Sequence, residues 1–304
     1  MAAVLVLVVS SAALWLIAAA PGDHLTDIDI PPETAEAERA RLGLDRPFLI
    51  QYGQWFRRVL VLDLGESLKY HRPVQDLVWE RGANTALLGM TALLLATVVG
   101  IPAGIWTGSS GGLGAAAARG ASMLLVSIPP LVTSFVLLLL ASYTRWLPVG
   151  GFGALSGDDA GGLFDVLRYV LLPSLALAAP VAAALERLQS QAMREALDDP
   201  SVQAARARGC SPARLVWRHA LRLSLKPVVA LYGVLVGTVL SGSFVVELVM
   251  SWPGLGALTY EALVSRDLYL VAGCAAAGSL FLALGVLASD LALAWVDPRL
   301  REPS

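Results

Sequence analysis

The chain has 304 residues, of which 56% are hydrophobic and 15% charged, and its net charge is −2. This composition lies outside the range of soluble proteins and predicts an integral membrane protein, while the near-neutral charge gives no indication of nucleic-acid binding. Two cysteines, Cys210 and Cys274, support neither a disulfide framework nor a metal site.

Apolar runs of membrane-spanning length dominate the sequence. Each has close to the ~20 residues that cross a bilayer as a helix. We therefore expect an all-α fold, a polytopic membrane bundle of about six transmembrane helices. The runs are Ala2–Ala20, Asn84–Thr107, Ala121–Tyr143, Tyr169–Leu185, Val228–Val246 and Leu268–Ser289.

The first run ends in Ala18–Ala20 and Pro21, which is similar to the cleavage site of a secretory signal. A basic region before the run is missing and Pro21 would hinder cleavage, so an uncleaved span is expected. The polar stretch that follows predicts one helix from about Pro32 to Leu42, closed by Gly43, and another from Pro47 to about Leu60. The second would pack on the membrane domain through an apolar side formed by Phe48, Tyr52, Trp55, Phe56 and Val59.

Small residues four apart predict close helix packing in the second and fifth spans. They are Gly100, Gly104 and Gly108, and Gly233, Gly237 and Ser241. Prolines in the third and fourth spans, Pro129, Pro130, Pro173 and Pro180, are expected to break the backbone hydrogen-bond ladder, either as walls of a pathway or as ordinary kinks.

A basic segment, Asp198–Val229, separates the fourth and fifth spans. Asp198 or Asp199 can cap a helix that starts at Pro200 and ends at Gly209. A second helix would begin with Ser211 as its cap and Pro212 in its first turn. Its cations recur every four residues and predict one stripe along the headgroup surface up to Pro227, although a solvated basic loop is the alternative. They are Arg214, Arg218, Arg222 and Lys226, with Leu215, Trp217, Leu221 and Leu225 on the other sides.

This segment resembles the cytoplasmic loop of permease subunits in binding-protein-dependent ATP-driven importers, specifically the B-type subunit of the dipeptide and oligopeptide branch. The Glu-Ala-Ala-x-x-x-Gly motif of that loop falls on residues 203–209, with Gln203 in place of the Glu, and is followed by pieces similar to HALR and PVV at residues 219–222 and 227–229. The resemblance implies a type I permease fold and a coupling helix that docks on an ATPase. The coupling residues would be Gln203, Ala204, Ala205, Arg206, Gly209, Ser211, His219 and Arg222.

The distribution of Lys and Arg predicts the orientation. With the amino terminus inside, inside segments carry Arg119, eight cations within residues 187–226, and two more after the last span, whereas the short outside loops carry Arg145, Arg168 and Arg266. Both termini and the basic loop are therefore expected in the cytoplasm. The expected division is residues 1–20 as the first transmembrane helix, 21–83 as an extracytoplasmic helical cap, and 84–304 as a five-helix core with the coupling loop at 186–227.

Residues 245–267, after the fifth span, resemble the outer loop of the same family, with PGLG as the most specific part. The resemblance implies an outer gate or a contact for the binding protein, and a Pro-Gly turn with solvated charges is the simpler interpretation. The residues concerned are Glu247, Trp252, Pro253, Gly254, Gly256, Arg266 and Asp267. The pieces LGLDRP, LDLGESL and RPV before residue 75 and the DPR at residues 297–299 are also similar to the family, whose members begin with a few more residues, including arginines.

Catalytic signals are weak. Gly108, Ser110 and Gly112 have the spacing of a nucleophile elbow, but a Gly-rich turn gives that spacing by chance. Neither Lys69 nor Lys226 lies in a phosphate-binding glycine loop, so ATP hydrolysis would require another subunit. The acids nearest the spans, Glu247 and Asp290, form no ladder across the membrane, which argues against a secondary transporter.

The resulting hypothesis is a non-enzymatic permease subunit of the bacterial inner membrane that imports di- or oligopeptides and needs no cofactor. Its implied partners are a second homologous permease subunit, two ATPase subunits or domains, an extracytoplasmic solute-binding protein and the lipid bilayer. Alternatives are an importer of the same type for nickel or another small solute, an intramembrane serine hydrolase that uses Ser110, and an ATP-independent carrier.

Overall fold

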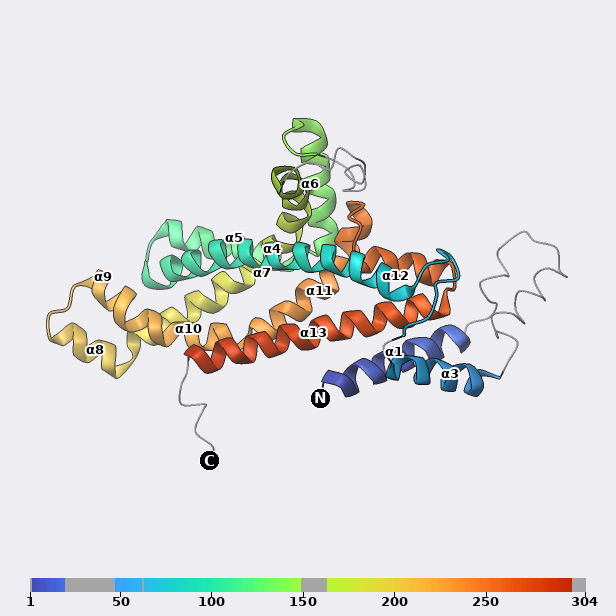
Figure 1. Cartoon of the computed structure of the whole chain (residues 1–304). Coiled ribbons are helices and arrows are strands. Elements are labelled where there is room, and N and C mark those ends of the chain that lie inside the picture. Colours follow the sequence, from blue (N-terminus) through green and yellow to red (C-terminus); the bar gives the residue numbers. More distant parts are fainter. Residues whose placement is uncertain (1, 20–46, 62, 149–162, 297–304) are drawn as a thin grey trace, which may run out of the picture. The chain divides into compact units, whose positions relative to one another are not determined.

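The computed structural model describes residues 2–19, 47–61, 63–148 and 163–296, and nearly all of them are helical (Figure 1). Within these ranges the extended pairing is a single bridge between Glu66 and Pro73. The all-α prediction is confirmed. The helices are α1 (Ala2–Ala19), α3 (Phe48–Leu60), α4 (Val74–Ser109), α5 (Leu113–Ser127), α6 (Pro130–Thr144), α7 (Leu163–Asp198), α8 (Pro200–Ala207), α9 (Pro212–Arg214), the π-helical turn η2 (Leu215–Ala220), α10 (Leu221–Ala230), α11 (Tyr232–Val249), α12 (Leu255–Val264) and α13 (Leu268–Val296).

Among the described residues, four helices are long and apolar enough to cross a membrane, namely α4, α7, α11 and α13, and the pair α5 and α6 makes a fifth if it is one span. The first predicted span forms helix α1, whose apolar stretch Val4–Ile17 is shorter than the ~20 residues that a crossing needs. The helix predicted near Pro32–Leu42 lies outside the described residues. The helix predicted from Pro47 is confirmed as α3.

The third predicted span is broken rather than continuous. Helices α5 and α6 meet at an angle of 105°, with Ile128 and Pro129 between them. Pro129 has extended backbone angles and Pro130 is the first residue of α6, where its missing N–H costs no helical hydrogen bond. The predicted break at these prolines is thus a full change of direction.

The prolines of the fourth span leave it a single helix, although they remove bonds from its backbone hydrogen-bond ladder as predicted. Helix α7 runs unbroken for 36 residues through Pro173 and Pro180. Pro180 has no N–H for the carbonyl of Ala176, four residues earlier. The hydroxyl of Thr133 on α6 donates to that carbonyl at 3.1 Å, so a neighbouring helix supplies the missing donor.

The chain forms two compact units. Unit 1 comprises Met1–Thr85 and Pro253–Ala283, and its interior includes Trp55 on α3 packed with Leu14 of α1 and Leu268 of α13. Unit 2 comprises Ala86–Trp252 and Leu284–Ser304. Its largest apolar cluster is built around residues of α4, α7 and α11, among them Leu88, Leu177, Leu185, Val239 and Val246.

Candidate functional site

Helix α8 of unit 2 is a short, well-capped element. The carboxylate of Asp199 accepts a hydrogen bond from the amide of Ser201 at 2.8 Å and another from the Ser201 hydroxyl. These bonds, the hydroxyl one first, lower the pKa of Asp199 below its ordinary value. Pro200 is the first helical residue, and Gly209 follows the end of the helix with φ +84°, a conformation that favours glycine. The predicted helix between Asp199 and Gly209 is confirmed.

The two faces of α8 have different environments. Val202 and Ala205 are buried in a cluster with Leu215 of η2. The side-chain amide of Gln203 donates to the carbonyl of Leu197 at the end of α7, at 2.8 Å. Ala204 and Arg206 are exposed. The buried face therefore fixes α8 to the loop, and the opposite face is exposed.

The second predicted helix differs from expectation, because a π-helical turn interrupts it. A π turn closes after five residues, so Leu215 and Ala220, five apart, both lie inside, in separate apolar clusters. The four-residue spacing of the cations lies between the roughly 3.6 residues of an α turn and the wider π turn, so this turn does not separate them, and the single stripe stays a prediction. Arg214, Arg218 and Arg222 are exposed, whereas Lys226 is half-buried.

Other details of this segment also differ from the prediction. The Ser211 hydroxyl makes no capping hydrogen bond, although Ser211 does precede the first helical residue. Pro227 lies inside α10, and the helix is interrupted instead by the single turn residue Leu231, just before α11. Trp217, expected to pack with the leucines, is 62% exposed, and His219 is half-buried. Figure 1 shows α8 and α9 at one end of this unit.

The loop is joined to the spans through closely packed helices. A Cβ atom added at Gly100, Gly104 or Gly108 of α4 would lie 2.5–2.8 Å from atoms of α7, including carbonyl oxygens. The predicted close approach through these glycines is confirmed, with α7 as the partner helix. A polar contact continues the connection to α10, because the side-chain amide of Gln189 on α7 donates to the hydroxyl of Ser224 at 2.9 Å.

The predicted outer residues are mostly buried. In unit 2, Glu247 and Trp252 are 0% and 2% exposed, and the Trp252 amide donates to the Glu247 carbonyl at 2.9 Å. In unit 1, Gly254 precedes α12, and the amide of Leu255 donates to the hydroxyl of Thr85 at 2.7 Å. The side-chain amide of Asn84 donates to the carbonyl of Pro253 at 2.8 Å. The PGLG turn of unit 1 is therefore held by the start of α4, and Gly256 within it is half-buried.

Asp267 has a role that the sequence did not reveal. It is 0% exposed, and one carboxylate oxygen accepts from the Ser67 hydroxyl at 2.6 Å and the Lys69 amide at 3.1 Å. The other oxygen accepts from the Leu270 amide in the first turn of α13 at 3.1 Å. Asp267 thus caps a helix and anchors the loop before α4 at once. Its neighbour Arg266 is half-buried with φ +52°.

A glutamate of α12 holds the same loop of unit 1. The hydroxyl of Tyr70 donates to the carboxylate of Glu261, which also lies 3.6 Å from the amino group of Lys69. Burial, followed by this hydrogen bond, raises the pKa of Tyr70 to about 12. The loop at residues 63–73 is therefore held by Glu261 of α12 and by Asp267, the residue before α13.

Comparison with known proteins identifies the scaffold that carries these features. A family profile described as "Binding-protein-dependent transport system inner membrane component" matches residues 100–302. The chain belongs to this family. The oligopeptide transport system permease protein AppB of Bacillus subtilis is 30% identical over 292 residues, which cover 93% of this chain and 90% of that protein. The dipeptide transport system permease protein DppB of Escherichia coli is 32% identical over 308 residues, covering 92% and 90%.

The predicted resemblance to the dipeptide and oligopeptide branch is thereby confirmed. The matched residues of this permease include the loop from α8 to α10 and all of the predicted outer residues. Ser110 of the permease lies in the turn between two helices, and its amide donates to the carbonyl of Trp106 on α4 at 2.9 Å. A nucleophile elbow needs a strand before the serine, and α4 stands in that place.

Proposed function

We propose that the chain is the membrane-spanning subunit of an ATP-driven importer of di- or oligopeptides, and that α8 is the helix through which ATPase subunits drive it. AppB and DppB are named for oligopeptide and dipeptide transport. The proposed partners are a second homologous permease subunit, two ATPase subunits or domains, and an extracytoplasmic binding protein. The excess of Lys and Arg in the loop supports a cytoplasmic location for it.

The observation that carries the proposal is the asymmetry of α8. A coupling element must be rigid and must present a surface to its partner while it transmits force to the spans. The cap at Asp199, the turn at Gly209 and the buried face around Ala205 supply rigidity. The exposed face around Ala204 supplies the surface.

The outer residues act by supporting the surface that faces the binding protein. Trp252 and Asp267 are buried, so they hold the outer segments in shape from within their own units. Exposed side chains of α12, such as Tyr260 and Val264, then provide the contact itself. Closure of the ATPase subunits would move α8 with α7 and α10, and the spans would change from inward-facing to outward-facing.

The test uses the tagged chain purified in mild detergent from the membrane of its native cell. Ala204→Glu places a charge on the exposed face of α8 without disturbing its buried face. Ala117→Glu, at an exposed position of α5, is the matched control. Substitution at Ala205 is avoided because that residue is 1% exposed and a glutamate there would disrupt the loop itself.

Wild type and the Ala117→Glu variant should co-purify with a second permease and an ATPase, with ATPase activity stimulated by the loaded binding protein. Ala204→Glu should lose at least tenfold of that stimulation, because a buried unpaired charge at an interface costs well over 1.4 kcal/mol. Equal stimulation in both variants would refute the role of α8. Transport by the purified chain without nucleotide would identify a carrier instead.

A further inference from the structure

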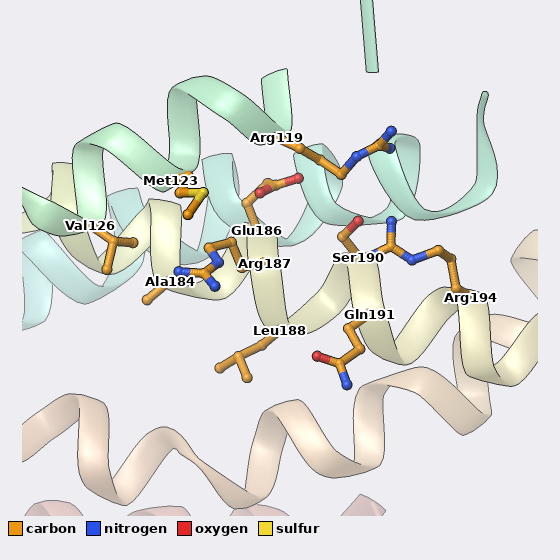
Figure 2. Close-up of a pocket in the computed structure, with 10 residues that line it drawn as sticks. All are labelled: Arg119, Met123, Val126, Ala184, Glu186, Arg187, Leu188, Ser190, Gln191 and Arg194. Atoms are coloured by element: carbon orange, nitrogen blue, oxygen red, sulfur yellow. The ribbon is translucent and has the colours of Figure 1, made fainter. Parts of the chain in front are cut away.

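A pocket of about 480 Å³ lies between α5 and α7 of unit 2 (Figure 2). Helix α5 contributes Arg119 and Met123, and α7 contributes Glu186, Arg187, Ser190 and Arg194. The volume falls within the roughly 300–1,000 Å³ of typical small-molecule sites. We call this pocket the α5–α7 groove.

The polar residues of α7 reach the groove because of their spacing. Glu186, Ser190 and Arg194 are four apart, which places them on one face of the helix, and Arg187 lies beside that face. Figure 2 shows Arg187 toward one end of the groove and Arg119 and Arg194 toward the other. Buried ionisable side chains are costly unless they are paired, and those that line a cavity are candidates for contact with a ligand.

The acid in the groove has an unused acceptor. Glu186 is 2% exposed, and one carboxylate oxygen accepts from the Thr107 hydroxyl of α4. The other oxygen is buried and has no hydrogen-bond partner among the described residues, and the same holds for the hydroxyl of Ser190 one turn later. Buried polar atoms without partners are uncommon, and a ligand that binds there is one physical explanation. The ligand group that suits a carboxylate is a hydrogen-bond donor with positive charge.

The arginines of the groove would pair with a negatively charged group of a ligand. Arg119 donates to the Thr107 carbonyl at 2.6 Å, so one of its nitrogens is already engaged. Arg187 and Arg194 are exposed, and neither forms an ion pair with any part of the chain that the structure describes. A guanidinium group pairs most strongly with a carboxylate or phosphate in a bidentate geometry. The groove therefore offers one buried negative charge beside free positive ones.

We propose that the α5–α7 groove is a transit site for the charged ends of a free peptide, with the ammonium group at Glu186 and Ser190 and the carboxylate at Arg187 or Arg194. This inference rests on the proposed function and specifies which residues of the permease the cargo meets. Recognition of the two ends is independent of the side chains between them. Met123, which is 63% exposed at the rim, is a flexible side chain that can adapt to varied residues.

The test measures binding without ATPase activity or binding protein. Met123→Cys, in a Cys210→Ser background, gives a reporter in the groove, because the remaining native cysteine, Cys274, is 2% exposed. The variant is reconstituted in phosphatidylcholine and phosphatidylglycerol nanodiscs and treated with a fluorescent maleimide. The labelling rate is read from the fluorescence of the gel band that contains this chain. Three probes are compared. Dialanine has both charged ends, N-acetyl-dialanine has only the carboxylate, and dialanine amide has only the ammonium group.

Dialanine should slow labelling at least tenfold more effectively than either blocked probe. Glu186→Gln should remove the preference for dialanine over N-acetyl-dialanine and retain the preference over dialanine amide. Arg187→Gln with Arg194→Gln should do the reverse. Asp198→Asn, an exposed acid of α7 outside the groove, should change neither preference. A merely structural role of Glu186 would not produce this matching of residue to ligand charge.

Absence of protection by dialanine would overturn the inference, as would equal protection by all three probes. Slower labelling on adding phosphatidylethanolamine, with no effect of dialanine, would make the groove a lipid site and would also overturn it. Each of these results leaves the effect of Ala204→Glu on ATPase activity untouched. Failure of the transit site and failure of the proposed coupling are therefore distinguishable.

Discussion

The contact between α4 and α7 gives the sharpest stability prediction. At Gly104 an added Cβ atom would lie 2.6 Å from the Cβ of Gln189 and 2.7 Å from the carbonyl oxygen of Glu186. An ordinary van der Waals contact begins near 3.4 Å, so Gly104→Ala must separate the two helices locally by about 0.8 Å. Overpacking of this kind costs about 1–3 kcal/mol, against a gain of about 0.5–1 kcal/mol in helix propensity.

Gly104→Ala should therefore destabilise the permease by about 1–2 kcal/mol. Gly120→Ala is the matched control, because Gly120 lies inside α5 with nothing within 4 Å of an added Cβ atom. That variant should gain about 0.5–1 kcal/mol from propensity alone. The same chemical change then has opposite signs at two helical glycines.

The assay is thermal unfolding in detergent at a fixed scan rate, in a Cys210→Ser background because Cys210 is half-buried, and a thiol-reactive dye reports exposure of the buried Cys274. At roughly 2–4 °C per kcal/mol, Gly104→Ala should lower the midpoint by about 2–8 °C, and Gly120→Ala should leave it unchanged or raise it. A midpoint for Gly104→Ala at or above that of wild type would show that α4 and α7 are not in the close contact described above.

Three further predictions follow from the loops. Asp267→Ala should cost about 3 kcal/mol, because it leaves buried donors unpaired, and should expose Lys69 to faster tryptic cleavage. Gly209→Ala should cost about 1–2 kcal/mol through its backbone conformation alone, and it should reduce ATPase stimulation while partners still co-purify. The pKa of Tyr70 is raised from 10.0 to about 12, so its hydrogen bond to Glu261 stabilises the folded protein fully below pH 10 and is lost as the pH rises to 12. Tyr70→Phe should therefore melt at a lower temperature than wild type below pH 10, and the two melting temperatures should converge between pH 10 and 12.

The features that sequence reasoning found are those that local chemistry determines. The helix at Asp199–Gly209 needs only a capping carboxylate, a proline in its first turn and a glycine at its end. The glycines of α4 need only their four-residue spacing to form a flat surface. The sequence does not predict which helix packs there, and the structure shows that it is α7. Hydrophobic length likewise predicts the long spans directly.

The features that it missed depend on partners far along the chain. Asp267 contacts Ser67 across 200 residues, and Thr133 reaches the carbonyl that Pro180 leaves free on α7. The sequence does not reveal Glu186 for a different reason. The predicted apolar run ends at Leu185, which places Glu186 at the start of a polar loop, whereas α7 continues as a helix to Asp198. The four-residue spacing of Glu186, Ser190 and Arg194 was the available signal.

One helix therefore connects the two proposals. Helix α7 carries the polar face of the α5–α7 groove, ends at the loop that bears α8, and contacts α10 through Gln189 and Ser224. The close packing of α4 on the α7 backbone at three glycines would resist a displacement of α7 alone. In the proposed motion the hinge would be Leu231, the single turn residue between α10 and α11. Movement of the loop would then shift the charged face of α7 in the groove relative to α11. Release of a bound peptide would therefore be coupled to movement of α8.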